Sequence, residues 1–344
     1  MRQAIMTAPG TVKIVEAAIP EPNSNQVQIN VKRIGICGSD VHVWHGAHPF
    51  TSYPVIQGHE YCGIVSKIGA DVTDICEGQL VTALPQEVCG KCVPCRRGNW
   101  HVCDNLKVRG FQAPGCAQDY FVTETDKVIV LPESFTLEQG AFIEPLAVAS
   151  HSTARAGQLA GANVAVMGAG TIGNFVAQMA QAKGAKVIIG DVSETRLGVA
   201  QNCGLAHGFN PAVEPLSSAV ESVFGTQGVD VVFDCAGVQA SLDAAISSVN
   251  KGGTVLVVAV FGQRPQVDMA VVCESELNLI GTMMYHHDDY QQAVERLLVG
   301  DIKTAPLESE HFTLEEFQAA YEFIDRRASE SMKVFIDLDR RTSP

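Results

Sequence analysis

Six side chains in the amino-terminal part of this 344-residue chain could do acid–base or metal chemistry: Cys37, Ser39, His42, His59, Glu60 and Glu144. The first three lie in GICGSDVHVW, the next two in GHEYCG, and the last in the apolar stretch FIEPLAVASH. One thiolate, one imidazole and one or two carboxylates would make a mixed-ligand zinc site of the catalytic type, which leaves a position for water or substrate. A histidine beside a glutamate more often has a structural role, so the spacing alone does not decide between a zinc site and a structural role.

A second set of possible ligands lies in EVCGKCVPCRRGNWHVC, where four cysteines are spaced C-x2-C-x2-C-x7-C: Cys89, Cys92, Cys95 and Cys103. Four thiolates can close a tetrahedron around zinc and leave no position for substrate, which is typical of a structural site. Similar spacings also hold iron–sulfur clusters, but nothing else in the sequence suggests electron transfer. We therefore predict one structural zinc ion in addition to the catalytic one.

A glycine-rich segment, VAVMGAGTIGNFVAQ, places Gly168, Gly170 and Gly173 in G-x-G-x-x-G order after a predicted strand and at the start of a predicted helix. In that context the glycines allow a tight turn, close approach of a pyrophosphate and close helix–strand packing. Asp191 ends the next apolar segment, KVIIGD, where a carboxylate can bind an adenosine ribose and repel a 2′-phosphate. The pattern predicts NAD; the alternative is a plain βα turn with Asp191 as a helix cap.

The elements that position these groups fall into two regions. From residue 164 to about residue 282, five short apolar runs alternate with helical stripes and predict a parallel α/β sheet: NVAVMG, KVIIGD, DVVFDCAG, GTVLVVAVFG and LNLIGTM. The region before this sheet contains short strands such as VQINVKRIG and GHEYCGIVSKIG, broken by Pro, Gly and Asp, and it predicts an irregular, mostly β domain.

The region after the α/β sheet predicts two helices and a strand. The helices are DDYQQAVERLLVG and TLEEFQAAYEFIDRR, and Thr313 and Glu316 open the second at capping-box spacing. The closing segment KVFIDL is typical of a strand.

Composition limits the possible partners. The formal net charge of −14 disfavours nucleic acid and anionic membranes, which need a basic face, so a small molecule is the expected partner. No apolar run reaches the eighteen or so residues of a membrane span, and MRQAIMTAPG has no signal-peptide pattern, so we expect a cytoplasmic protein. In that reducing compartment the 11 cysteines favour metal ligands over disulfides.

Taken together, GICGSD, GHE, the four-cysteine segment, EPLAVA and GAGTIG occur in the order of one family. The chain resembles the medium-chain, zinc-dependent alcohol and polyol dehydrogenases, in particular sorbitol dehydrogenase and related sugar-alcohol and sugar-acid enzymes. The resemblance covers essentially the whole chain. It implies a GroES-like catalytic domain, 1–149 completed by about 285–344, and a Rossmann NAD-binding domain at 150–284.

The resemblance also implies roles for the first group of side chains. Cys37, His59, Glu60 and Glu144 would surround the catalytic zinc, with either carboxylate able to exchange with water. Ser39 and His42 would relay the proton from the alcohol. Two alternatives stay open from the residues themselves: His45 could replace His42, and Ser39 could also act as a helix N-cap.

On the nucleotide side, the resemblance implies that three residues contact NAD: Ile172, Asp191 and Arg196. It places two further segments near the nicotinamide and its ribose, 258–260 with Val258 and Val260, and 283–285 with Met283, Met284 and Tyr285. Some sorbitol-type enzymes have an arginine where this chain has Met284, so a polar contact to substrate or cofactor is missing.

The expected reaction is hydride transfer from a secondary alcohol of a polyol, sugar alcohol or sugar acid to NAD, which gives a ketone and NADH. Within enzymes, the alternative is a butanediol- or threonine-type dehydrogenase. Outside enzymes, the alternative is a regulator that binds zinc and a nucleotide but has no turnover. The loss of a residue that binds the metal would indicate such a regulator, and none of these residues is missing from the sequence. The resemblance further implies homodimers or homotetramers that extend the Rossmann sheet, for which GTVLVVAVFG is apolar enough.

Overall fold

The computed structural model describes residues 1–340 and divides into two compact units. The first unit contains Met1–Glu144 and the residues from Glu308 onward, and the second contains Pro145–Leu307. The chain passes from the first unit to the second inside one long helix, α3 (Leu137–Arg155). The first unit is therefore discontinuous in sequence, whereas the second is one uninterrupted segment.

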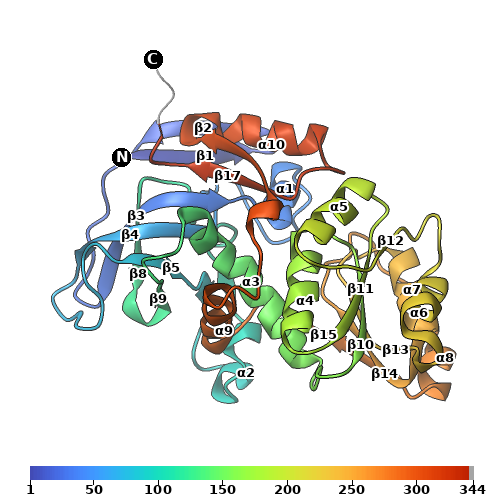
Figure 1. Cartoon of the computed structure of the whole chain (residues 1–344). Helices are drawn as coiled ribbons and strands as arrows, with labels where there is room; N and C mark the ends of the chain where they lie inside the picture. Colours follow the sequence, from blue (N-terminus) through green and yellow to red (C-terminus); the bar gives the residue numbers. More distant parts are fainter. Residues whose placement is uncertain (341–344) are drawn as a thin grey trace. The chain divides into compact units, whose positions relative to one another are not determined.

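A seven-stranded sheet forms the frame of the first unit (Figure 1). The strand order is β16-β17-β3-β4-β5-β9, and β8 also pairs with β3. In chain order the strands are β3 (Gln26–Gly35), β4 (Glu60–Ile68), β5 (Leu80–Ala83), β8 (Tyr120–Glu124), β9 (Val128–Val130), β16 (Glu308–Thr313) and β17 (Lys333–Asp337). β3 is buried along most of its length because it lies inside the sheet, between β4 and β17. The predicted strands VQINVKRIG, GHEYCGIVSKIG and KVFIDL are confirmed.

Shorter elements flank this sheet. They are the hairpin β1 (Arg2–Ala8) and β2 (Thr11–Glu16), the strand pair β6 (Gln86–Glu87) and β7 (Lys107–Val108), and the helices α1 (Gly38–Trp44), α2 (Val93–Arg96) and α10 (Phe317–Arg326). The predicted capping box before α10 is confirmed, because the backbone N–H of Thr313 donates to Glu316 Oε2 at 2.9 Å. Both residues fix the turn that leads from β16 into α10.

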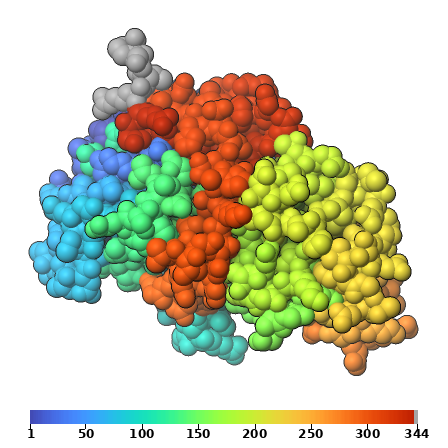
Figure 2. Space-filling view, in the orientation of Figure 1, coloured from blue at the N-terminus to red at the C-terminus, as the bar shows by residue number. Residues whose placement is uncertain are grey.

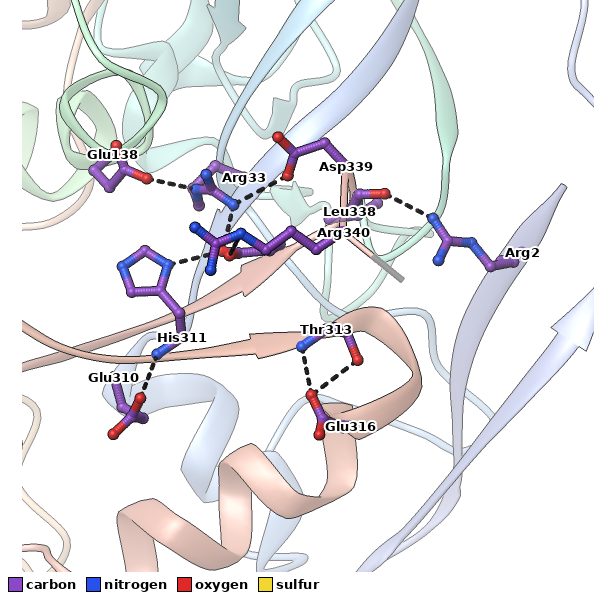
Figure 3. A network of polar contacts seen from close by, with 11 residues as sticks. Arg2, Arg33, Glu138, Glu310, His311, Thr313, Glu316, Leu338, Asp339 and Arg340 are labelled. Atoms are coloured by element: carbon purple, nitrogen blue, oxygen red, sulfur yellow. Dashed lines mark hydrogen bonds and ion pairs between the residues drawn. The ribbon is translucent and has the colours of Figure 1, made fainter. Parts of the chain in front are cut away.

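Buried charges hold the C-terminal strand in place. Arg33 on β3 pairs with Asp337 on β17 and, through Nε, with Glu138 of α3 at 2.8 Å (Figure 3). His311 on β16 contacts the same Asp337 carboxylate at 2.8 Å. In Figure 1 the red strand β17 lies among the blue N-terminal strands, as its pairing with β3 requires, and Figure 2 shows the same orientation as a surface coloured by residue number. β17 is thus an inner strand of the first unit's sheet.

The second unit contains a six-stranded, wholly parallel sheet in the order β12-β11-β10-β13-β14-β15. The strands are β10 (Asn163–Met167), β11 (Lys186–Gly190), β12 (Gly208–Phe209), β13 (Val229–Asp234), β14 (Val249–Val257) and β15 (Asn278–Gly281). Numbered from β10, this is the order 3-2-1-4-5-6 of a doubly wound dinucleotide-binding sheet. All five predicted apolar runs therefore enter the sheet, as expected for strands covered on both faces.

Helices connect these parallel strands: α4 (Thr171–Ala182), α5 (Glu194–Asn202), α6 (Leu216–Phe224), α7 (Gln239–Ser248) and α8 (Met269–Glu274). A further helix, α9 (His287–Leu298), follows the last of these strands, β15. α4 is the helix predicted to start at the glycine segment, and its side chains Phe175, Val176 and Met179 are fully buried. Across residues 1–340, no helix combines the length and the apolar composition that crossing a bilayer requires.

The prediction for GTVLVVAVFG is partly wrong. β14 begins at Val249, before that run, and ends at Val257. The next two backbone N–H groups, of Val258 and Ala259, both donate to the carbonyl of Asp234, which turns the chain out of the strand ladder. β14 is also an inner strand, and the edge strands of the sheet are β12 and β15.

Candidate functional site

The structure brings Cys37, His59 and Glu60 together in the first unit. Their ligand atoms all lie within 4.8 Å of one another. The antiparallel pairing of β3 and β4 places Gly35 opposite Glu60, so the thiol just after β3 meets the acid at the start of β4. Glu144 in α3 is not in this group of three, but it is buried and its negative charge acts on His59.

The surroundings of His59 are negative. Burial alone would lower the pKa of His59, but Asp40, Cys37 and Glu144 outweigh burial and raise this pKa well above 6.5. His59 Nδ1 is buried, has no hydrogen-bond partner among residues 1–340, and lies 3.6 Å from Asp40 Oδ1. A sulfur, an imidazole and carboxylates in a negative pocket are a donor set that suits Zn²⁺.

Asp40 belongs to this site, although the sequence showed it only as a neighbour of Ser39. It is 1% exposed and accepts hydrogen bonds from the Cys37 backbone N–H at 3.0 Å and from Gln57 Nε2 at 3.2 Å. The hydroxyl of Tyr321 in α10 donates to Gln57 Oε1 at 2.7 Å. These contacts fix the side of the pocket that faces His59, in the way that carboxylates orient metal-binding histidines.

Lys333 is a second residue that the sequence did not reveal, because a lysine at the start of KVFIDL is typical of a surface position. Its side chain is buried, and its Nζ donates to Glu60 Oε2 and, at 3.1 Å, to the carbonyl of Ile36. A Cβ at Gly35 would lie 2.5 Å from Glu60 Oε2, so glycine is needed there to leave room for the ion pair. β17 thus supplies the counter-charge of a predicted metal ligand.

Removal of that counter-charge should be costly. We expect Lys333→Met to lower the free energy of unfolding by about 3 kcal/mol, because Glu60 would be left buried and unpaired. The matched control is Lys67→Met, since Lys67 pairs with Glu21 at the surface and such pairs contribute about 1 kcal/mol or less. Urea unfolding of both variants checks this. Equal midpoints would show that the Lys333–Glu60 pair does not stabilise the fold.

The predicted proton relay lies on α1. Ser39 is half-buried and His42 is exposed near the end of this short helix. The idea that Ser39 is the helix N-cap is wrong, because Cys37 occupies the N-cap position and Ser39 lies inside the first turn. His45 Nε2 contacts Asp325 Oδ1 in α10 at 2.9 Å. Because His45 already has this partner, His42 is favoured as the residue that releases the proton to water.

The four cysteines of the segment that runs from β6 through α2 to Cys103 form the second ligand group. The sulfur atoms of Cys89, Cys92, Cys95 and Cys103 lie within 4.8 Å of one another, as four corners of one site would. Hydrogen bonds from the backbone N–H groups of Lys91 and Cys92 lower the pKa of the Cys89 thiol to about 6, which favours the thiolate that metals bind. This group fits a closed tetrahedral site.

The glycine loop joins β10 to α4 in the second unit. Gly168 has a φ of +99°, and a Cβ at Gly173 would lie 1.8 Å from the Gly168 carbonyl oxygen, so both positions require glycine. Gly170 is the N-cap of α4, and Ile172 lies half-buried in its first turn. The free N–H groups at this helix start suit a phosphate.

Asp191 follows β11 and lies next to this loop. Its Oδ2 accepts from the Ala169 backbone N–H at 2.8 Å, and its Oδ1 accepts from the Ser193 backbone N–H at 2.9 Å. Arg196 Nη1 lies 3.9 Å from Oδ2. Each carboxylate oxygen has a further lone pair, so Asp191 can hold the loop and still accept from a ribose hydroxyl.

The remaining predicted cofactor contacts lie at the carboxyl ends of neighbouring parallel strands, where such sheets bind ligands. Val258 follows β14, and Val260 is highly exposed. Met283 is exposed after β15, and Met284 has a φ of +52°, a conformation that is rare for a residue with a side chain. Tyr285 is fully buried against Tyr290, so it packs in the core of the unit.

Comparison with known proteins identifies both parts of the chain. Residues 23–133 match the alcohol dehydrogenase GroES-like domain, and residues 171–299 match the zinc-binding dehydrogenase model. The 2-dehydro-3-deoxy-L-galactonate 5-dehydrogenase of Pseudoalteromonas atlantica is 32% identical over 94% of this chain and 95% of its own. D-xylulose reductase A of Aspergillus niger is 34% identical over 94% and 93%.

Among solved structures, a zinc-binding dehydrogenase of Sinorhizobium meliloti bound to NADP superposes with a TM-score of 0.89 at 28% identity. The match covers 98% of each chain. The predicted fold, a GroES-like domain with a Rossmann domain, is confirmed, as is the predicted resemblance. The chain belongs to the family of zinc-binding dehydrogenases with an alcohol dehydrogenase GroES-like domain.

Proposed function

We propose that this dehydrogenase oxidises a secondary alcohol carbon of a polyol or sugar acid to a ketone, with NAD as hydride acceptor. The grouping of Cys37, His59 and Glu60 within 4.8 Å carries the proposal, because this donor set suits a catalytic metal. The names of two relatives, a 2-dehydro-3-deoxy-L-galactonate 5-dehydrogenase and a D-xylulose reductase, support a polyol or sugar acid as the substrate class.

The residues divide the work as follows. Cys37 and His59 would hold zinc together with Glu60 or Glu144, and the four-cysteine group would hold a second zinc with a structural role. Bound at the first site, zinc would supply Lewis acidity that lowers the pKa of the alcohol hydroxyl. Ser39 and the exposed His42 would carry the hydroxyl proton to water, since a serine hydroxyl can accept one proton as it passes on its own and an imidazole can bind and release one.

The second unit would bind the nucleotide. The glycine loop Gly168–Gly173 receives the pyrophosphate, and Asp191 accepts from the adenosine ribose, with Ile172 and Arg196 beside it. Val258, Val260, Met283 and Met284 would lie near the nicotinamide. The absorbance of NADH during initial-rate screening with hexitols, pentitols, aldonates, inositols and small diols tests the function. Absence of NADH formation with all of them would contradict it.

Cofactor choice gives a sharper test of Asp191. Wild type should prefer NAD to NADP, although one relative binds NADP, because a carboxylate repels a 2′-phosphate. Asp191→Ser should reduce this preference about tenfold or more, since it removes an acceptor and a like charge. Asp191→Asn separates the two effects, because it keeps an acceptor for Ala169. The ratio of kcat/KM for the two cofactors is the measurement, and a ratio that neither substitution changes would contradict the placement.

We further infer a homodimer or homotetramer that forms through β15. This strand is one of the two edges of the parallel sheet, and Leu279 on it is 37% exposed. Such an unpaired apolar edge favours strand pairing with a second copy. Light scattering of the purified protein should give a multiple of the chain mass, and Leu279→Lys should reduce it to the mass of one chain.

A cytoplasmic location stays a prediction, which fractionation of expressing cells would test.

A further inference from the structure

His48 lies close to the candidate metal site but has no part in the relay or the ligand set. Its ring stacks on Phe111 with a centroid distance of 4.8 Å and an interplanar angle of 17°. Phe111 is buried and also contacts the ring of His59, with a centroid distance of 4.9 Å. The ring of Phe111 therefore lies between His48 and a predicted metal ligand.

The two ring nitrogens of His48 have different surroundings. Nδ1 lies 2.7 Å from the hydroxyl oxygen of Thr51, whereas Nε2 makes no hydrogen bond within residues 1–340. Burial lowers the pKa of His48, and the nearby His42 and His59 lower it further, which favours the neutral ring. When the Thr51 hydroxyl donates to Nδ1, the single ring proton is on Nε2, which can then donate.

There is space for a ligand beside these rings. Phe50 and Phe111, both in contact with the ring of His48, line a cavity of about 470 Å³ together with Ser52 and Gln112. This volume is within the range of small-molecule sites. His48 is not among the residues that line the cavity, and it borders the cavity only through the rings of Phe50 and Phe111.

We propose that His48 is a specificity-determining residue whose Nε2–H donates a hydrogen bond to an oxygen on the substrate chain, away from the reacting carbon. Polyols and sugar acids carry such an oxygen, as a hydroxyl or a carboxylate, but simple secondary alcohols do not. A site built to donate this bond discriminates against chains that leave the donor unpaired. The inference rests on the proposed function and narrows it to polyoxygenated chains.

The test compares substrates with and without the remote oxygen. Initial rates with NAD are measured for sorbitol, gluconate and 2-butanol, with wild type, His48→Phe and His48→Gln. Phenylalanine keeps a ring on Phe111 but cannot donate, whereas glutamine can restore the donor. In His48→Phe, kcat/KM for the better of sorbitol and gluconate should fall about tenfold, mainly through KM, and that for 2-butanol should change less than about twofold.

Thr51 supplies the matched pair of variants. Thr51→Val removes the hydroxyl that orients Nδ1 and should lower kcat/KM for the same substrate, whereas Thr51→Ser keeps the hydroxyl and should not. A loss confined to gluconate identifies the carboxylate as the partner of Nε2, and a loss shared with sorbitol identifies a hydroxyl. An equal fall for 2-butanol, or no fall for either polyoxygenated substrate, would overturn the role of His48.

Binding separates this result from failure of the proposed function. Calorimetry measures the affinity of zinc-loaded wild type and His48→Phe for sorbitol and gluconate in the presence of NADH. If wild type oxidises 2-butanol but His48→Phe binds and oxidises every substrate equally well, the inference fails and the function stands. If no alcohol is oxidised, the function fails, and weaker binding by His48→Phe still supports the inference. Equal or absent binding in both proteins overturns it.

Discussion

Cys37→Ser or His59→Ala should reduce kcat/KM with the best alcohol by at least about a thousandfold, while the chain stays folded. Both side chains belong to the tight three-residue group in the first unit. Loss of a catalytic metal removes several kcal/mol of transition-state stabilisation, and about 1.4 kcal/mol corresponds to a tenfold change in rate. The fold should survive, because the first unit has its own hydrophobic core, which includes Val27, Ile29 and Ile34.

Three measurements check this result: kcat/KM, zinc content by metal analysis, and far-ultraviolet circular dichroism. Zinc content should fall from two ions per chain to one in each variant. Cys76→Ser is the matched control, since Cys76 is an exposed cysteine of the same unit. Loss of all secondary structure in the Cys37 or His59 variant would contradict the separation of catalysis from folding, and near-normal turnover would contradict the metal role.

Cys92→Ser or Cys95→Ser should instead destabilise the protein. These sulfurs lie in the four-cysteine group, where an opened site would lose folding free energy rather than a reaction centre. A loss of several kcal/mol should lower the thermal midpoint by roughly 5–10 °C. Turnover measured well below that midpoint should stay within about tenfold of wild type, because no substrate position exists in a closed site.

For this pair, Cys273→Ser is the control, since Cys273 is exposed and lies in the second unit. Thermal unfolding and zinc content are measured for all three variants. An unchanged midpoint together with two zinc ions per chain would rule out a structural site at the four cysteines. A fall in zinc content with a normal midpoint would show that the metal binds there without stabilising the fold.

The sequence predicted the parts of the site that depend on local spacing. The four cysteines, and the glycine loop with the strands β10 and β11 on either side of it, could be placed because each motif is short and continuous in sequence. Lys333 could not be predicted, because its partner Glu60 is 273 positions away in sequence and only the pairing of β17 with β3 brings them together. Asp40 was visible, but its contacts with Cys37 and Gln57 depend on tertiary packing.

The errors have a similar cause. The apolar run 253–262 matched a strand throughout, yet the carbonyl of Asp234 on the neighbouring strand takes the N–H groups of Val258 and Ala259 and ends β14 early. Ser39 has the residue type of a helix cap, but the chain leaves β3 so that Cys37 takes that position. In both cases a non-local hydrogen bond or chain direction outweighed a local preference.

The division of the first unit between two stretches of sequence has a consequence for biosynthesis. A ribosome completes residues 145–307 before it makes β16 and β17, a delay on the order of ten seconds at ordinary rates of elongation. During that interval the nascent sheet has an open edge at β3, and Glu60 lacks the ammonium group of Lys333. We expect the continuous α/β segment to fold first on the emerging polypeptide, and the amino-terminal segment to depend on chaperones until the closing strand arrives.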